Sequence, residues 1–297
     1  MNLEVFNVVQ DSIQRLSDKM IHEHQYIPEH DSPMPSLIKV GRLVELIRSI
    51  VFPGYHGNEL SKSNTLEFHL SINLHTLYEL LTEQIFHGLN FENTENSFDN
   101  ETLAKNISLV FVKKIPELKR VLATDIKATF DGDPAAKSYS EVIYCYPSIR
   151  AVLNHRVAHE LFKLGVPAIP RVIAELAHSE TGIDIHPGAQ IGEYFSIDHG
   201  TGVVIGETSI IGKRVRLYQG VTLGAKNFTF DSDGNPINIP RHPILEDNVV
   251  VYANANILGR ITIGENSVIG GNVWLTKNTP SNSRILQQKV DIQTSLI

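Results

Sequence analysis

An aliphatic residue recurs at every sixth position through most of the second half of this 297-residue chain. The recurring residues form three runs: Ile185, Ile191, Ile197 and Val203; Ile205, Ile211, Leu217 and Leu223; and Leu245, Val251, Ile257, Ile263, Ile269 and Leu275. An α-helix repeats every 3.6 residues and a β-strand every 2, so neither gives a spacing of six. A chain that coils in hexapeptide repeats does give it, because each aliphatic side chain then points into a prism-shaped core. The pattern therefore predicts a solenoid of stacked coils.

Two interruptions break this period. A slip of two residues follows Val203, and 22 residues separate Leu223 from Leu245, which is three repeats plus four residues. The segment 225–243 in the second interruption is polar and rich in Asn and Pro, so we expect it to leave the coil as an excursion loop. Long loops within a regular scaffold are often functional.

The first half of the chain has a helical period instead. Apolar residues three and four positions apart predict helices over 37–52, 65–88, 101–130 and 147–165, and a shorter one after Pro170. Ser36 is expected to begin the first helix, and the polar residues 90–100 are expected to form a loop. The sequence thus predicts an α+β protein in three parts: a helical N-terminal domain over 1–180, a coil domain over 181–279 that includes the excursion loop 225–243, and a C-terminal tail over 280–297.

Charge and composition exclude several classes of protein. The chain has 26 Lys and Arg against 33 Asp and Glu, a net charge of −7, which argues against a protein that binds nucleic acid. No apolar run is long enough to span a bilayer, and the N-terminus lacks the pattern of a secretory signal. Cys145 is the only cysteine, which excludes an internal disulfide framework and fits a reducing compartment. We therefore expect a cytoplasmic protein.

The candidate site consists of polar residues that interrupt the repeat. They are Asp184 and His186, Asp198 and His199, and Arg241 and His242. A histidine oriented by a carboxylate can deprotonate a hydroxyl near neutral pH, and a nearby arginine suits a substrate carboxylate. The three histidines are alternatively metal ligands, as in carbonic anhydrases built on hexapeptide coils, but none has a partner at the short spacing common in zinc sites. The pattern favours acid–base chemistry and leaves the metal-binding alternative open.

Several motifs in this region resemble one family. The segment HPGAQIGEYFSIDHGTGVVIGET (186–208), followed by QGVTLG (219–224) and RHP (241–243), is similar to serine acetyltransferases, and so are Asp133-Pro134-Ala135 and RVAHEL (156–161). The resemblance covers about residues 130–277, while the first 125 residues match only in being helical. It implies a helical N-terminal domain on a left-handed parallel β-helix, in agreement with the period of six. It also implies transfer of an acetyl group from acetyl-CoA to the hydroxyl of L-serine, which gives O-acetyl-L-serine for cysteine biosynthesis.

The resemblance implies a role for each candidate residue except His186, which is expected to be a structural residue of a corner. His199 would be the general base, and Asp184 would orient it. These two residues lie fifteen positions apart, less than one turn of eighteen, so they are expected within about one strand spacing along the coil. The serine ammonium and carboxylate groups would bind four further residues: Asp133 and Asp198 at the ammonium, and Arg241 and His242 at the carboxylate.

Acetyl-CoA would lie near Gly224, Ala225 and Ala253, where small side chains let a ligand approach the backbone closely. No metal is expected. This chain departs from the family at Ala225, where a second glycine is usual, and it lacks the segment AGVPA that usually follows the coil. Both departures concern the contacts with CoA rather than the type of reaction.

The resemblance also implies partners. The chain would form a trimer or a dimer of trimers, and L-cysteine would inhibit it by competing with serine. The C-terminal Ile297 would bind the active site of O-acetylserine sulfhydrylase through its carboxylate and side chain. Alternative functions are acetyl transfer to another hydroxyl or amine, such as homoserine or a sugar, and metal binding by the coil.

Overall fold

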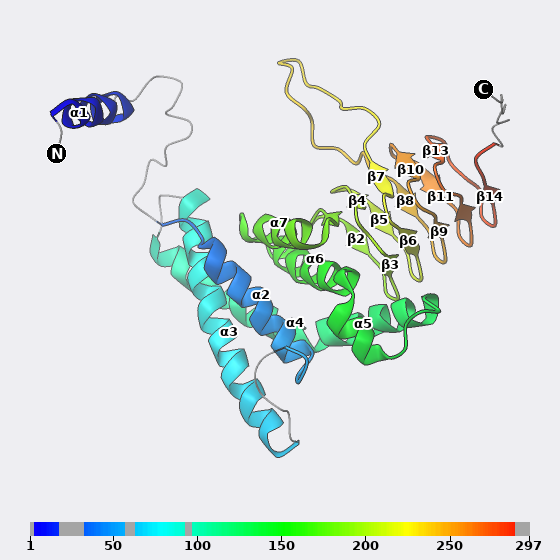
Figure 1. Ribbon diagram of the computed structural model, residues 1–297, viewed down its shortest axis with the longest axis horizontal. Coiled ribbons are helices and arrows are strands. Elements are labelled where there is room, and N and C mark those ends of the chain that lie inside the picture. Colours follow the sequence, from blue (N-terminus) through cyan, green and yellow to red (C-terminus); the bar gives the residue numbers. More distant parts are fainter. Residues whose placement is uncertain (1–2, 18–32, 57–62, 93–96, 289–297) are drawn as a thin grey trace.

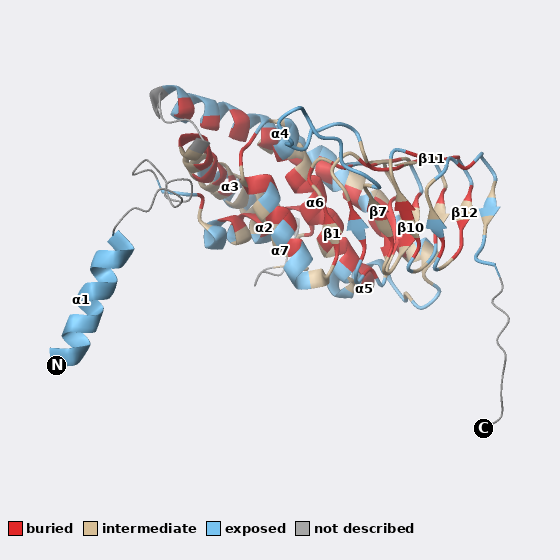
Figure 2. Cartoon of the chain, turned by 90° about the horizontal axis from the view of Figure 1, so that it is seen from above, coloured by how far each residue is buried: buried red, intermediate tan, exposed pale blue. Residues whose placement is uncertain are grey.

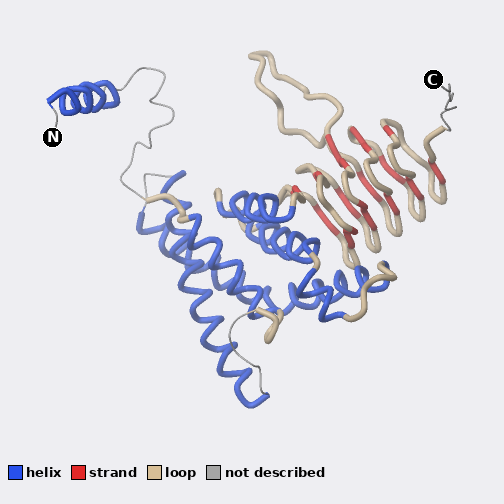
Figure 3. Tube along the Cα trace, in the orientation of Figure 1, coloured by secondary structure: helices blue, strands red, loops and turns tan. Residues whose placement is uncertain are grey.

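The computed structural model describes residues 3–17, 33–56, 63–92 and 97–288, and in it the helices precede the strands (Figure 1). The helices are α1 (Leu3–Ser17), α2 (Leu37–Val51), α3 (Ser63–Glu92), α4 (Ser97–Gly132), α5 (Tyr139–Cys145), α6 (Pro147–Lys163) and α7 (Ile169–Thr181). The strands are β1 (Asp184–Ile185), β2 (Gln190–Ile191), β3 (Ser196–Asp198), β4 (Val204–Ile205), β5 (Ile210–Ile211), β6 (Arg216–Tyr218), β7 (Thr222–Gly224), β8 (Ile244–Leu245), β9 (Val250–Val251), β10 (Asn256–Leu258), β11 (Thr262–Ile263), β12 (Val268–Ile269), β13 (Trp274–Leu275) and β14 (Arg284–Ile285). Figure 3 shows the strands stacked as successive turns beside the helices.

The helix predicted after Ser36 is confirmed. The Ser36 hydroxyl accepts a hydrogen bond from the backbone N–H of Lys39, and α2 ends at Val51, two residues before Pro53. A serine in this position satisfies one of the N–H groups that the first turn of a helix leaves unpaired.

The loop predicted over residues 90–100 is too long, because its described ends, 90–92 and 97–100, are helical. Helix α3 continues through Gly88 to Glu92, and α4 begins at Ser97. Asn90 and Asn100 are buried, and the Asn100 side chain donates a hydrogen bond of 2.8 Å to that of Asn90. Their polarity suggested a loop, but two buried amides that satisfy each other are compatible with packed helices. Helices α1 and α5 have no counterpart among the predicted helices.

The strands form three parallel sheets, one on each face of a left-handed coil. The first sheet has the order β1-β4-β7-β10-β13, the second β11-β8-β5-β2 and the third β14-β12-β9-β6-β3. In the turns that contain no slip, excursion or shortening, strand partners are eighteen residues apart, as Val204 and Thr222 are, and Val250 and Val268. Three hexapeptides therefore make one turn, and the predicted fold, helices followed by a left-handed parallel β-helix, is confirmed.

The aliphatic residues of the six-residue period point into the coil, where Leu217 and Leu245 are fully buried. A second buried set, two positions earlier in the repeat, comprises Ile183, Ala189, Phe195, Val203, Val215, Val221, Val249, Ala255 and Ile261. Val203 belongs to this second set, since Ile205 occupies the six-residue position in β4. The slip therefore lies before Val203 and not after it: Ser196 pairs with Arg216, twenty residues later, and the two extra residues fall within 199–202.

The coil continues beyond residue 279, where the sequence analysis begins the tail. Strand β14 pairs with β12, with Arg284 opposite Val268, sixteen residues apart. Because this last turn is two residues shorter than the regular turns of eighteen, the spacing of six is lost while the strand stays in register. Ile285 packs against the core as the aliphatic residues of earlier turns do. Residues 289–297 of the predicted tail lie outside the described residues.

A buried ion pair joins the helices to the first turn of the coil. Arg156 of α6 donates hydrogen bonds of 2.6 and 2.8 Å to the carboxylate of Asp125 in α4. Arg156 also donates to the backbone carbonyl groups of Ile191 and Gly192, and Asp125 accepts from the backbone N–H of Phe195. Buried residues accordingly continue from the helices into the coil (Figure 2). The division into separate domains at residue 180 stays a prediction, because one core runs through both parts.

We expect Asp125→Ala to lower the free energy of unfolding by about 3–5 kcal/mol, because it leaves the buried Arg156 guanidinium without its carboxylate. Urea titrations followed by circular dichroism measure this change. Asp131→Ala, which removes an exposed partner of Lys127 in the same helix, is the control and should change stability little. Equal urea midpoints for the two variants would contradict a role of Asp125 in joining the two parts.

Candidate active site

The predicted site residues are divided between two corners of the coil. The His199 corner (residues 199–203) leads from β3 in the third sheet to β4 in the first sheet. The Arg241 corner (residues 241–243) ends the excursion, which projects from the coil between β7 and β8 (Figure 1), and leads into the second sheet. Within one chain, the first sheet therefore lies between the two groups of residues.

His199 occupies a turn that requires left-handed backbone. Its φ is 57°, and those of Gly200 and Gly202 are 96° and 80°. Histidine tolerates this conformation better than most residues, and a Cβ added to Gly200 would lie only 2.5 Å from Ile183 Cδ1. The His199 side chain is 75% exposed, and its Nε2 lies 4.0 Å from Asp198 Oδ1. The turn thus presents an accessible imidazole beside a carboxylate.

Asp184 lies beside the same corner. It begins β1, and its backbone N–H donates a hydrogen bond of 2.9 Å to the carbonyl group of Val203. Among the contacts of the described residues, the carboxylate paired with His199 is that of Asp198, and Asp184 makes no hydrogen bond with the imidazole. The role of Asp184 in orienting His199 stays a prediction, and the geometry offers Asp198 as an alternative.

Asp133 comes from the helical part and reaches the same corner. Its carboxylate accepts a hydrogen bond of 2.8 Å from the backbone N–H of Ala135 and one of 2.5 Å from the Tyr146 hydroxyl. These bonds lower the pKa of Asp133, and a smaller contribution comes from the nearby His199 and Arg216. The same contact raises the pKa of Tyr146 to about 12. Asp133 is thus held as an anion close to His199.

Two residues that the sequence analysis missed position Asp133. Tyr146 binds its carboxylate directly, and Arg216 of β6 donates a hydrogen bond of 3.0 Å to the carbonyl group of Gly132. A Cβ at Gly132 would lie 2.0 Å from Arg216 Nη2, so this guanidinium needs a glycine beside it. Neither residue interrupts the repeat or carries a motif, so no signal in the sequence marked them.

Arg241 is fixed at the other corner by its neighbours. Its guanidinium donates hydrogen bonds of 2.6 Å to Glu207 and 2.8 Å to Asn238. Burial alone would raise the pKa of Glu207, but the hydrogen bonds from Arg241 and Asn238 lower it below its ordinary value. Glu207 therefore orients an arginine that remains partly exposed.

His242 is a buried, neutral residue. Burial and the charge of Arg241 lower the pKa of His242 to about 4. Its Nδ1 accepts a hydrogen bond of 3.1 Å from the backbone N–H of Thr208, which leaves the proton on Nε2. Its ring lies against Gly206, where an added Cβ would be 2.0 Å from His242 Cδ2. At neutral pH, His242 offers an N–H donor and no positive charge.

The residues predicted to bind acetyl-CoA are also divided. Gly224 and Ala225 lie at the end of β7, where the excursion begins, whereas Ala253 lies between β9 and β10 at the corner between the third and first sheets. A groove of about 270 Å³ runs beneath the excursion, between Lys226 and Arg260. One chain thus places small residues on both sides of its first sheet.

No group of three or more His, Cys, Asp and Glu side chains in the described parts of the chain is arranged to hold a metal ion. None of the helices described is both long enough and apolar enough to cross a membrane.

Comparison with known proteins places this geometry in a family. The sequence model described as "Bacterial transferase hexapeptide (six repeats)" matches residues 242–277. A protein of Synechococcus elongatus named "Serine acetyltransferase, plasmid" is 46% identical over 274 residues, which are 90% of this chain and 86% of that protein.

Two crystal structures are similar over most of the chain. Serine acetyltransferase isoform 3 of Entamoeba histolytica, in complex with cysteine, has a TM-score of 0.73 and 33% identity and covers 97% of this chain and 93% of its own. Serine acetyltransferase of Brucella abortus strain S19, in complex with coenzyme A, has a TM-score of 0.56 and 26% identity and covers 86% of this chain and 96% of its own. Because the Synechococcus elongatus protein is 46% identical over 90% of this chain, the chain belongs to the serine acetyltransferase family.

Proposed function

We propose that this protein transfers the acetyl group of acetyl-CoA to the hydroxyl of L-serine and so forms O-acetyl-L-serine. The observation that carries this proposal is the 46% identity with a serine acetyltransferase over 90% of the chain. The two corners supply groups suited to the reaction: an accessible imidazole beside carboxylates at one, and an oriented arginine at the other.

In the proposed mechanism His199 is the general base. Its imidazole takes the proton of the serine hydroxyl while the oxygen attacks the carbonyl carbon of the thioester. The tetrahedral intermediate collapses, the carbon–sulfur bond breaks, and His199 returns the proton to the CoA thiolate. A positioned base of this kind contributes about 10²–10⁴-fold to the rate.

The charges of the two corners match the two charged groups of serine. Asp133 and Asp198 would bind the ammonium group beside His199, and Arg241 would bind the carboxylate. Because His242 is neutral and buried, we assign it the donation of a hydrogen bond, or support of the corner, rather than a charge. The small residues Gly224, Ala225 and Ala253 would border acetyl-CoA.

The experiment that tests the proposal is a thiol-release assay with acetyl-CoA and a panel of L-serine, L-homoserine and sugars. L-Serine should be the fastest acceptor, and Arg241→Ala should raise its KM about 10–100-fold through loss of a charge-assisted hydrogen bond to the carboxylate. Arg284→Ala, at an exposed position of β14, is the matched control and should leave KM unchanged. A faster reaction with a sugar would refute the proposal.

We propose that the active site forms between neighbouring copies in a trimer, alone or in a dimer of trimers. In one chain the His199 corner and the Arg241 corner lie at opposite ends of the strands of the first sheet. A heterologous three-fold ring can bring the His199 corner of each copy to the Arg241 corner of its neighbour. L-Cysteine, which has a thiol in place of the serine hydroxyl, would compete at the same charged groups. Light scattering distinguishes a trimer, a dimer of trimers and a monomer, and a monomer would contradict the shared site.

We also propose a complex with O-acetylserine sulfhydrylase through Ile297, which lies outside the described residues. A terminal carboxylate and one apolar side chain suit capture by backbone amides and a pocket. Deletion of Ile297 should abolish binding in calorimetry and leave acetyl transfer intact. An undiminished binding heat with the shortened chain would refute the contact.

The cytoplasm is the proposed location. Cys145 is exposed and free, and an exposed free thiol persists most readily in a reducing compartment. Fractionation of cells with an antibody to the protein tests this, and recovery with secreted proteins would contradict it.

A further inference from the structure

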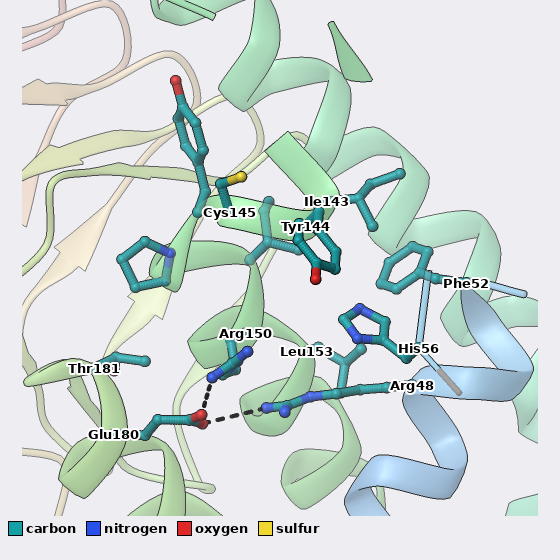
Figure 4. A pocket seen from close by; sticks show the side chains of 13 residues that line it. Arg48, Phe52, His56, Ile143, Tyr144, Cys145, Arg150, Leu153, Glu180 and Thr181 are labelled. Carbon is teal, nitrogen blue, oxygen red and sulfur yellow. Dashed lines mark hydrogen bonds and ion pairs between the residues drawn. The ribbon is translucent and has the colours of Figure 1, made fainter. Parts of the chain in front are cut away.

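A pocket between α2, α5, α6 and α7 is balanced in charge by its own side chains and their partners (Figure 4). Arg48 and Arg150 both pair with Glu180, and Arg48 also pairs with Glu45 at 2.6 Å. Two arginines are thus matched by two glutamates, and the pocket has no excess charge that calls for a ligand. The surface that calls for a partner lies on the coil instead.

The outer face of the first sheet is uncharged in four of its five strands. In β4, β7, β10 and β13 the residues that alternate with the core aliphatic ones point away from the core, because successive side chains of a strand point to opposite faces. These outward residues are Val204, Thr222, Gly224, Asn256, Leu258 and Trp274. The third sheet, by comparison, carries Arg216 and Arg284 on its strands. Depletion of charged side chains is typical of the core of a protein–protein interface.

Trp274 is the most exposed large apolar residue of this face, with 69% of its surface accessible. It begins β13, near the end of the coil that is remote from the helices (Figure 1). Burial of an aromatic side chain removes about 150–250 Å² from water. Tryptophan is also enriched among the few residues that dominate the binding energy of interfaces. An exposed indole on an uncharged sheet therefore suits a surface that another protein chain covers.

The two corners of the proposed site determine which chain that is, an inference that rests on the proposed function. They lie at opposite ends of the strands of the first sheet. When the His199 corner of each copy meets the Arg241 corner of the next, the three first sheets become the sides of a triangle around the axis. The coils must lie outside this triangle, because three triangular prisms of the same side length cannot fit within it. The outer face of each first sheet then faces the axis.

We propose that the first sheets of three copies of this chain face one another across a three-fold axis and that their Trp274 side chains pack together there. Strand β13 lies two strands beyond β7 in the sheet, which is about 10 Å along the coil. The excursion that carries Arg241 leaves the coil at β7. The three tryptophans therefore hold the copies together beyond the level of the site and take no part in acetyl transfer.

The first experiment uses Trp274 as its own probe, because it is the only tryptophan of the chain. Its fluorescence is measured in the full chain with acrylamide as quencher, and light scattering on the same sample gives the number of copies. We expect a trimer, alone or doubled, in which acrylamide quenches Trp274 much less than in the protein unfolded by urea. A trimer whose Trp274 is quenched as strongly as in urea would overturn the proposal, and so would a monomer or a dimer.

The second experiment places a carboxylate on the same face, far from the tryptophan. Val204→Asp in β4 is three strands from Trp274, about 14 Å along the coil, and brings three negative charges together at the axis. It should dissociate the trimer, shift the emission of Trp274 to longer wavelength and raise its quenching, with an unchanged circular dichroism spectrum. Leu286→Asp, at a residue 57% exposed just after β14 of the third sheet, is the matched control and should change none of these. A trimer with protected Trp274 in Val204→Asp would overturn the proposal.

The third experiment removes the indole itself. Trp274→Ala should raise the dissociation constant of the trimer at least about 30-fold, as truncation of a dominant aromatic residue does at an interface. Light scattering on a dilution series measures this change, and Leu286→Ala is the control with an unchanged constant. At concentrations where Trp274→Ala still assembles, its rate of serine acetylation should equal that of the unmodified protein. Equal dissociation constants for the two variants would overturn the role of Trp274.

These measurements separate the assembly from the reaction. Neither light scattering nor fluorescence depends on the acceptor of the acetyl group. A trimer with a protected Trp274 that fails to acetylate serine would refute the proposed function and leave the packing at the axis intact. A monomer that acetylates serine would refute the packing at the axis and the shared site, but not the reaction.

Discussion

Replacement of His199 by alanine should lower kcat for serine acetylation by about 10²–10⁴-fold, because it removes the general base of the proposed mechanism. The side chain is largely exposed and lies in a turn fixed by Gly200 and Gly202, so its removal should leave the fold intact. Steady-state rates of thiol release measure the change. His178→Ala, at an exposed position of α7, is the matched control and should retain full activity.

The same assay distinguishes the two carboxylates near His199. If Asp184 orients the imidazole, Asp184→Asn should reduce kcat with little change in the KM for serine. If Asp198 does so, as its distance of 4.0 Å from His199 allows, Asp198→Asn should reduce kcat in addition to raising that KM. A rate close to that of the unmodified enzyme in His199→Ala would remove the basis of the whole assignment.

At serine concentrations well below KM, mixed trimers of His199→Ala and Arg241→Ala chains should recover activity that neither variant shows alone, which is the second large effect. The His199→Ala chain still carries Arg241, and the Arg241→Ala chain still carries His199, so a site shared between chains is complete where the two kinds of chain meet in the right order. Each mixed ring of three chains has one junction in the right order, so one of its three sites is complete. The activity of purified mixed trimers should therefore rise from a low background to about a third of that of the unmodified enzyme.

Co-expression of the two variants with different affinity tags, followed by purification through both tags, gives the required mixed assemblies. The control is the double variant with His199→Ala and Arg241→Ala in the same chain, co-expressed with both tags and purified in the same way. It should stay inactive. No recovery in mixed trimers would show that each chain forms its own site. In that event the excursion would have to bring Arg241 across the first sheet within one copy.

The sequence determined the coil because its signal is local and repeated. A buried aliphatic residue at every sixth position specifies one inward-facing side chain per face, and each turn repeats the same requirement. The same local logic placed the cap at Ser36 and the excursion between Gly224 and Ile244. The polar residues at the interruptions could be recognised for the same reason: they occupy positions where the repeat predicts an aliphatic residue or a tight turn.

Only the tertiary structure decided which of these residues lie together. The position of the slip, before Val203, and the shortened last turn that carries Ile285 depend on strand register, which the spacing of one set of residues does not fix. The pairing of Tyr146 with Asp133 joins residues of the helical part, and the ion pair of Asp125 with Arg156 buries two charges that sequence periodicity does not detect. The separation of His199 from Arg241 is likewise a property of three faces around a coil: a linear sequence gives the distance along the chain, whereas the corner that each residue reaches depends on how every intervening turn closes.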